Sequence, residues 1–444
     1  MPLKTMTPPV TAPSTPTVST LTQEGIDLQA PNSNVQAGKR SLAPLKASSV
    51  QVNLTSSPRP VPALDDPSVA SSSVCTDHML TVSWNATTGW ETPQIRPYGP
   101  LSLMPTASVL HYATECFEGL KLYRGYDNKL RFFRINRNCQ RMRGSANRIA
   151  LPDFEPSELE KLIIALAKVD GSKWLPKDSH KGKFLYCRPT LISDDATLGV
   201  QRPSKALLFV ILTVFPDMSD PKALEKKTPT PSQTATELTP TSKLETKDEV
   251  QGLKLLASSE DTIRAWPGGF GYAKLGANYG PSLVAQGVAR DRGFNQILWL
   301  FGQENYVTEA GASNFFVVIK NKETGVDELI TAGLEDKVIL EGVTRASILD
   351  MVRERLPELT VVERKYTMNE VKEAVEEGRM IEAFAAGTAF FVAPVGLIEW
   401  KGTQLRIPTA EGHTGKFARQ LRAWLSGIMY GEEQHEWGVI VEEN

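Results

Sequence analysis

The sequence has few of the residues that form disulfides and metal sites. Its 444 residues include four cysteines and five histidines. The cysteines form no CxxC pair and the histidines are scattered, so we expect no bound metal. Widely spaced cysteines of this kind favour reduced thiols in an intracellular protein.

Long hydrophobic runs and an excess of charge are also lacking. The run ALLFVILTV (206–214) is far shorter than the roughly 20 apolar residues that cross a bilayer. A formal net charge of −2 creates no strong field toward nucleic acid or an anionic membrane. We therefore expect a soluble protein without nucleic-acid or membrane partners, and its 41% hydrophobic residues suffice for a sizeable core.

The N-terminal segment, residues 1–73, lacks a sustained hydrophobic period. It is rich in Thr, Ser, Pro and Ala, which predicts a disordered tail. Its first twenty residues carry one lysine, no arginine and five prolines, unlike the Arg-rich amphipathic helix of a mitochondrial address. We expect a cytoplasmic protein, and a mitochondrial location stays open.

From residue 77 onward, apolar patterns with the periods of strands and helices alternate. The patterns predict strands at 131–134, 184–192, 206–215, 295–301 and 314–319, and helices at 157–169, 344–356 and 414–430. A polar stretch at 217–251 predicts a flexible insertion. We therefore predict an α/β protein with a smaller domain at 74–200 and a larger one at 201–437, which contains the disordered insertion.

One lysine stands out in RAWPGGFGYAKLGANYGPSLVAQ (264–286). Lys274 lies among several glycines, and glycine allows a backbone to approach a ligand closely. A lysine in a confined pocket can lose its proton and attack an aldehyde cofactor. An ordinary surface lysine explains this stretch equally well.

An acidic residue follows in YVTEAGASNFF (306–316), between two strand-like runs. Glu309 could be a solvated turn residue. It could instead face a pyridine nitrogen and keep it protonated, which makes the ring an electron sink.

Two further stretches offer groups for a phosphate. In LEGVTRASIL, Gly342, Val343 and Thr344 begin a predicted helix, whose free amides can bind an anion. Thr388 in FAAGTA and Arg141 could add a hydroxyl and a cation, although three nearby arginines compete with Arg141. Plain helix capping explains the first stretch equally well.

Together these stretches resemble the branched-chain aminotransferases, which are fold-type IV enzymes of pyridoxal 5'-phosphate (PLP). The resemblance covers about residues 76–437. It rests on seven stretches in family order: TDHMLTVSWN, LHYATECFEGLKLYRG, RMRGSANRIALP, RAWPGGFGYAKLGANYG, TEAGASNFF, LEGVTRASIL and AAGTAFFVAPVG.

The resemblance implies a role for each matching residue. Lys274 would be the Schiff-base lysine that also moves the substrate proton, Tyr279 would bind the phenolic oxygen, and Glu309 would bind the ring nitrogen. The implied phosphate-binding set is Arg141, Val343, Thr344 and Thr388. The implied substrate-binding set is Tyr112, Phe117, Tyr186, Arg188, Thr388 and Ala389, the last two through the backbone amides of their turn.

The function implied is transamination of leucine, isoleucine or valine with 2-oxoglutarate, in a homodimer. Three alternatives remain: a paralogue that prefers another amino acid, a D-amino-acid aminotransferase or aminodeoxychorismate lyase, and a catalytically silent interaction protein. One departure is clear. Mammalian members carry a redox CxxC where this chain has Phe390 and Ala393, which excludes a thiol switch there.

Overall fold

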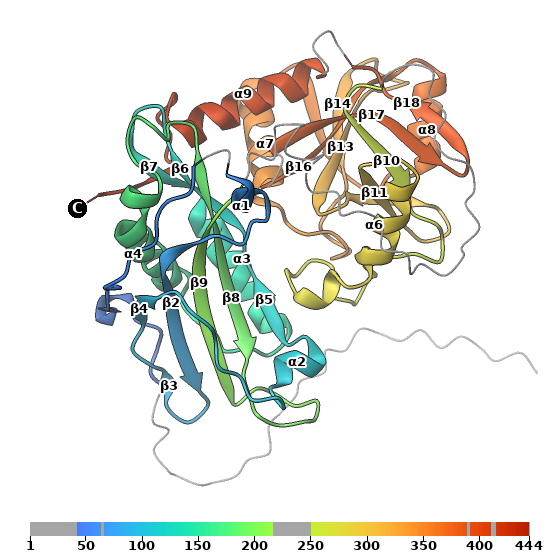
Figure 1. The fold of residues 1–444 in the computed structure, drawn as a ribbon. Helices are drawn as coiled ribbons and strands as arrows, with labels where there is room; N and C mark the ends of the chain where they lie inside the picture. Colours follow the sequence, from blue (N-terminus) through green and yellow to red (C-terminus); the bar gives the residue numbers. More distant parts are fainter. Residues whose placement is uncertain (1–41, 64–65, 216–249, 389–390, 410–413, 444) are drawn as a thin grey trace, which may run out of the picture. The chain divides into compact units, whose positions relative to one another are not determined.

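A computed structural model describes residues 42–63, 66–215, 250–388, 391–409 and 414–443. These residues build two β-sheets with helices packed on them (Figure 1). No helix within these ranges combines the length and the apolar character that a membrane crossing needs. The predicted insertion at 217–251 lies outside the described residues except for its last two positions, and so does most of the predicted tail.

The first sheet is largely antiparallel and has ten strands among the described residues. Its strand β9 alternates between buried and partly exposed positions, because one face packs on helices and the other does not. The helices α3 (Ile135–Arg148) and α4 (Pro156–Trp174) pack on it. The main strand order is β1 (Gln51–Val52), β4 (Gln94–Pro97), β2 (Cys75–Asn85), β9 (Lys205–Val214), β8 (Phe184–Ser193), β6 (Leu120–Arg124), β7 (Leu130–Phe133) and β19 (Gly438–Val441), with β3 (Gly89–Trp90) beside β2 and β5 (Glu115–Phe117) beside β8.

The second sheet has nine strands in the described part of the chain. Its strand β13 is buried on both faces: Phe315 and Val317 belong to one core cluster, Phe316 and Val318 to another. The main strand order is β12 (Tyr306–Ala310), β11 (Gln296–Phe301), β10 (Leu253–Ala257), β17 (Phe391–Trp400), β16 (Met380–Gly387), β13 (Ser313–Lys320), β14 (Asp327–Thr331) and β15 (Leu359–Glu363), with β18 (Thr403–Arg406) beside β17.

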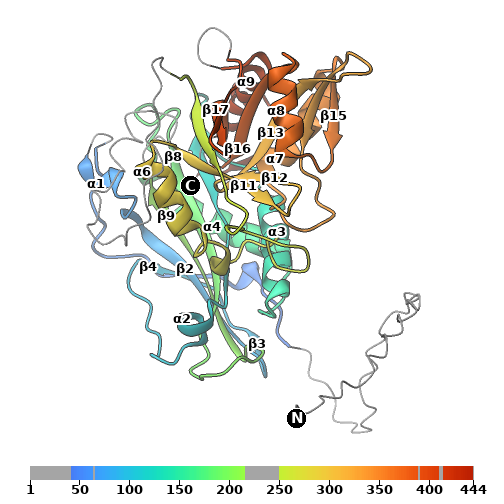
Figure 2. The same ribbon diagram turned by 90° about the vertical axis from the view of Figure 1, so that its right-hand side faces the viewer.

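Helices of the described ranges pack against the second sheet, which is why its central strands are continuously apolar. Figure 2 shows α8 and α9 beside its strands. The C-terminal helix α9 also contacts β6 and β7 of the first sheet. The helices on the second sheet are α6 (Ser282–Asp291), α7 (Val343–Arg355), α8 (Met368–Glu376) and α9 (Lys416–Tyr430).

The predicted elements are present, but the strands divide between the sheets differently from our expectation. Strand β9 pairs with β8 and β2, so the first sheet extends to Val214 instead of ending at residue 200. Strand β19 also returns to the first sheet, beyond the expected end at residue 437. Hydrophobic period predicts a strand but does not specify its neighbours, which explains the error.

The prediction of a disordered tail up to residue 73 is wrong for the described residues from Leu42 onward. Leu45 is only 3% exposed and belongs to the core of the first sheet. The amide of Ala47, at the start of the 3₁₀ turn Ala47–Ser49, donates to Glu158 Oε2 at 2.6 Å. Isolated apolar residues of this segment pack on a larger core, so they need no hydrophobic period of their own.

This packing predicts that Leu45→Ala lowers the free energy of unfolding by about 2–4 kcal/mol, the usual cost of truncating a buried leucine. The matched control is Leu54→Ala, because Leu54 lies in the same segment but is 63% exposed. Denaturant unfolding of both variants gives the comparison. Equal stability of the two variants would contradict the docking of this segment.

Candidate active site

The backbone of Lys274 is fixed by residues of the first sheet and its helix. The carbonyl of Lys274 accepts a hydrogen bond from the Phe117 amide at 3.1 Å. Its own amide donates to Ser145 Oγ at 2.8 Å. A β-bridge between Cys116 and Leu275 continues the contact. The loop that carries Lys274 is therefore held against β5 and α3, which limits where its side chain can reach.

The side chain of Lys274 points to a tyrosine. Its Nζ donates to the Tyr279 hydroxyl at 3.0 Å and lies 5.0 Å from the centroid of the Phe117 ring. The turn between the two residues is stabilised by Asn278, whose amide group donates to the carbonyls of Ala273 and Phe270 at 2.8 and 3.1 Å. The lysine predicted to bind the cofactor is thus half-buried beside aromatic rings.

Glu309 is a buried carboxylate, only 4% exposed, so its interpretation as a solvated turn residue is wrong. Its Oε1 accepts from the Leu340 amide at 3.0 Å and from Asn314 Nδ2 at 3.3 Å, and its Oε2 pairs with Arg264 at 2.5 Å. Burial raises the pKa of Glu309, and the Arg264 guanidinium opposes this effect.

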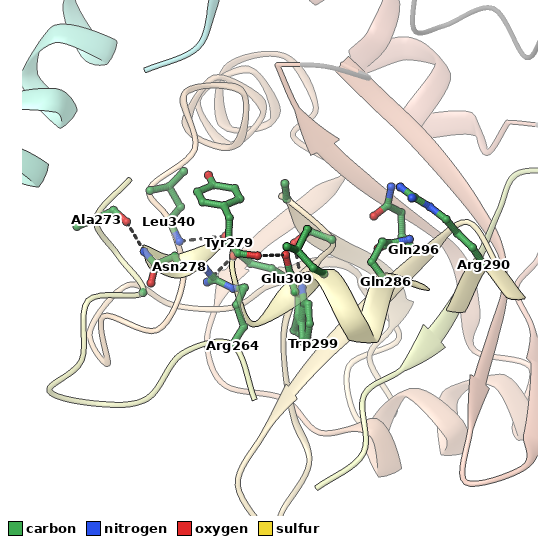
Figure 3. Close-up of a pocket in the computed structure, with 15 residues that line it drawn as sticks. Arg264, Ala273, Asn278, Tyr279, Gln286, Arg290, Gln296, Trp299, Glu309 and Leu340 are labelled. Carbon is green, nitrogen blue, oxygen red and sulfur yellow. Dashed lines mark hydrogen bonds and ion pairs between the residues drawn. The ribbon is translucent and has the colours of Figure 1, made fainter. Parts of the chain in front are cut away.

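Glu309 and Tyr279 line the same cavity, whose volume is about 270 Å³. Figure 3 shows Arg264 and Leu340 converging on Glu309 near the Tyr279 ring. The structure therefore places in one cavity the phenol and the carboxylate that the family resemblance assigns to two edges of one ring.

The predicted phosphate groups line two spaces that share Val343. Arg141 donates from Nη1 to the Glu341 carbonyl at 2.9 Å and lines a cavity of about 340 Å³ with Gly342 and Val343. Gly342 is the N-cap of α7 and makes no side-chain cap bond, as its lack of a side chain requires. A narrower space adjoins Val343 and is lined also by Thr344 and Thr388.

The arginines that competed with Arg141 in the sequence face other partners. Arg143 pairs with Asp153 at 2.6 Å on the surface. Arg148 donates to the Gly269 carbonyl at 3.4 Å. Arg137 also lines the larger cavity, but its closest acid is Glu341, at 3.7 Å. Arg141, by contrast, donates to the backbone carbonyl of Glu341, the residue before the N-cap of α7.

Sequence reasoning missed Glu118, which forms a two-bond ion pair with Arg141. Burial alone would raise its pKa, but the Arg141 guanidinium and further donors outweigh burial and hold the pKa below its usual range. The signal was visible in CFEGLKLY, where a carboxylate interrupts an apolar run. A buried charge of this kind needs a partner.

Phe117 lies beside Lys274, and two further predicted substrate residues, Arg188 and Tyr186, form a cluster with Phe117. The rings of Phe117 and Tyr279 are 5.2 Å apart. The Arg188 guanidinium lies 4.6 Å from the Phe117 centroid and donates to the Tyr186 hydroxyl at 3.2 Å. Space for this hydroxyl depends on the glycine that follows Glu118, since any Cβ there would overlap it.

Of the other predicted substrate residues, Tyr112 and Thr388 are described by the structure and Ala389 is not. Tyr112 ends the short helix α2 (Ser108–Tyr112), and its hydroxyl accepts from the Gly199 amide at 2.9 Å. Thr388 is described, whereas Ala389 and Phe390 lie outside the described residues. The backbone-amide role predicted for the Thr388–Ala389 turn therefore stays a prediction.

Comparison with known protein families shows to which family the chain belongs. Residues 115–398 match the family model of amino-transferase class IV. The chain therefore belongs to the class IV aminotransferases, which confirms the predicted fold class.

Within this class it belongs to the branched-chain-amino-acid aminotransferase family. It is 44% identical over 411 residues to the cytosolic branched-chain-amino-acid aminotransferase of Saccharomyces cerevisiae, covering 90% of this chain and 99% of that protein. It is 40% identical over 412 residues to the mitochondrial enzyme of the same yeast, covering 90% and 94%. The cytosolic enzyme of Mus musculus is 43% identical over 376 residues, with 84% and 88% covered.

Solved structures show the same fold at low sequence identity. The branched-chain amino acid aminotransferase of Escherichia coli matches with a TM-score of 0.57 and 21% identity, covering 82% of this chain and 98% of that chain. The enzyme from Thermobaculum terrenum, solved in its PLP form, matches with a TM-score of 0.59 and 22% identity, covering 82% and 98%.

Proposed function

We propose that this chain transfers the amino group of leucine, isoleucine or valine to 2-oxoglutarate with PLP as cofactor. The products are branched 2-oxo acids and glutamate. The observation that carries the proposal is the Lys274 amine, 3.0 Å from the hydroxyl of Tyr279, which lines the same cavity as the buried carboxylate of Glu309. The relatives named for the cytosol and the mitochondrion support a cytoplasmic location and keep a mitochondrial one open.

The donor set fits the polar groups of PLP. When bound, PLP supplies an aldehyde that condenses with amines and a ring that withdraws electrons from the substrate α-carbon. The amine of Lys274 suits the aldehyde, the Tyr279 hydroxyl suits the phenolic oxygen, and the buried carboxylate of Glu309 suits a protonated ring nitrogen. The guanidinium of Arg141 and the free amides at the start of α7 suit the phosphate.

The protein groups then have distinct tasks. Lys274 Nζ takes the proton from the substrate α-carbon and returns it, while the Tyr279 hydroxyl keeps Nζ oriented. Glu309 holds a proton on the ring nitrogen. Its burial excludes water that would weaken this interaction.

The proposed substrate pocket combines apolar ring surfaces with one cationic side chain, Arg188. The rings of Phe117 and Tyr186 offer apolar contact to an aliphatic side chain. Arg188 lies between them, and its buried Nε has no hydrogen-bond partner within the described residues. We assign to this guanidinium the second carboxylate of 2-oxoglutarate, which lets one pocket accept both substrates in turn.

Removal of the lysine tests the assignment. We expect Lys274→Ala to lose turnover of L-leucine with 2-oxoglutarate by several orders of magnitude, because the variant lacks the group that moves the proton. The absorption band of lysine-bound cofactor should vanish as well. Lys205→Ala, at an exposed position of β9, is the control and should keep both. A persistent band in Lys274→Ala would refute the role of Lys274.

A panel of substrates tests the specificity. We expect L-leucine, L-isoleucine and L-valine to react with 2-oxoglutarate far faster than D-alanine, and aminodeoxychorismate to remain uncleaved. Amino-acid consumption and glutamate formation give the measurement. A preference for D-alanine or lyase activity would contradict the proposal. Cofactor binding without turnover of any amino acid would favour a silent interaction protein.

We also propose that the enzyme is a homodimer in which an apolar tip of one protomer covers its partner's substrate side. The tip consists of α2 and residues 194–204, joined by the hydrogen bond from Gly199 to Tyr112. Leu198 and Val200 on this tip are 64% and 90% exposed. Exposed apolar clusters of this kind are typical of interaction surfaces. A predicted substrate residue, Tyr112, lies on the same tip.

This arrangement predicts that Val200→Asp weakens the dimer and raises KM for L-leucine, because the substitution puts a charge where Val200 would make apolar contact with the partner protomer. Leu54→Asp places the same charge at an exposed position elsewhere and should change neither. Analytical ultracentrifugation gives the dimer dissociation constant, and initial rates give KM. A wild-type monomer, or a Val200→Asp dimer with unchanged KM, would contradict the arrangement.

A further inference from the structure

Glu118 follows directly after strand β5 and is the most deeply buried acid of the site, with 1% of its surface exposed. Four donors surround its carboxylate. Oε1 accepts from Arg141 Nε at 2.7 Å. Oε2 accepts from Arg141 Nη2 and Asn138 Nδ2, both at 2.8 Å, and from the Gly119 amide at 3.1 Å. The carboxylate is thus held by the backbone of its own segment and by helix α3.

The ion pair leaves one side of the guanidinium for another ligand. Nε and Nη2 of Arg141 form the edge that Glu118 occupies. Nη1 donates one hydrogen to the carbonyl of Glu341, the residue before the N-cap of α7. Because Nη1 carries two hydrogens, its second one remains for an acceptor close to the start of α7.

We propose that Glu118 is a positioning residue, which orients Arg141 so that Nη1 and the α7 amides bind the cofactor phosphate together. This inference rests on the function proposed above. A bidentate pair fixes the plane of a guanidinium as well as its place. Without Glu118, the long arginine side chain would sample several rotamers, and binding would require ordering it again.

The charge of the pair supports this role. The Arg141 guanidinium and the other donors outweigh the effect of burial and lower the pKa of Glu118, so the carboxylate stays ionised at neutral pH. Burial lowers and Glu118 raises the pKa of Arg141, and the net shift is upward. Both partners are therefore charged before a phosphate binds.

The alternative is an ion pair that only stabilises the fold. The two roles differ in their dependence on the phosphate. A positioning residue affects a ligand that carries the phosphate and spares one that lacks it. A purely structural pair changes both equally. PLP and pyridoxal, which differ by this group alone, are therefore the two probes.

The experiment measures the dissociation constants of PLP and pyridoxal for the cofactor-free protein and for Glu118→Gln. A glutamine cannot satisfy all four donors, because its NH₂ group must face at least one of them. We expect PLP binding to weaken about ten- to hundredfold, as for a lost hydrogen bond between charged groups. Pyridoxal binding should change less than about twofold, since it makes no phosphate contact.

Further variants separate orientation from folding. Glu443→Gln is the matched control, because Glu443 forms a two-bond pair with buried Arg124 in the same sheet. It should leave both constants unchanged. Glu118→Asp keeps the charge but withdraws it by one methylene, and it replaces Glu118→Gln if that variant does not fold. The double variant Glu118→Gln/Arg141→Ala should bind PLP no more weakly than Arg141→Ala alone.

Equal weakening of PLP and pyridoxal, unchanged PLP binding, or tighter PLP binding in the Glu118 variants would each overturn the positioning role. Additive losses in the double variant would overturn it as well. A wild-type protein that binds neither compound at Lys274 would instead refute the proposed function. The two failures are therefore distinguishable.

Discussion

The site depends on two hydrogen bonds to the backbone of Lys274, one from the Phe117 amide and one to Ser145 Oγ. They attach a loop that follows the second sheet's strand β10 to strand β5 and helix α3. Side-chain contacts cannot replace them, because the reach of a lysine is set by where its Cα lies. Once that backbone is fixed, the 3.0 Å contact between Nζ and the Tyr279 hydroxyl follows from the short turn between the two residues.

Two buried ion pairs serve different parts of the site. Glu309 pairs with Arg264 at the place proposed for the ring nitrogen, and Arg141 pairs with Glu118 at the place proposed for the phosphate. Buried pairs contribute little net stability, since desolvation offsets most of the attraction. Their value here is geometric. Each pair keeps a charged group in place before the ligand arrives, so binding does not have to order it.

The sequence predicted the local elements better than their assembly into sheets. Lys274, Tyr279 and Glu309 were singled out through the family resemblance, because the local settings of Lys274 and Glu309 suit an ordinary surface lysine and a turn residue as well. Strand β9 was predicted as a strand and assigned to the wrong domain, since pairing is a long-range property. Leu45 was missed because one buried residue creates no period. Glu118 was missed for another reason: its partner Arg141 lies 23 residues further along the chain, and only the packing of α3 against β5 selects it among the neighbouring arginines.

The two sheets contribute different groups to the proposed site, and this bears on how substrate specificity can change in this family. Apart from Arg141, the proposed cofactor groups come from the second sheet and its loops, whereas the proposed substrate residues Phe117, Tyr186 and Arg188 come from strands β5 and β8 of the first. Substitutions at Tyr186 or Arg188 can therefore reshape the pocket without displacing Lys274. Phe117 is the exception, because its amide also holds the Lys274 carbonyl. A substitution of Phe117 must therefore keep the backbone geometry that positions Lys274.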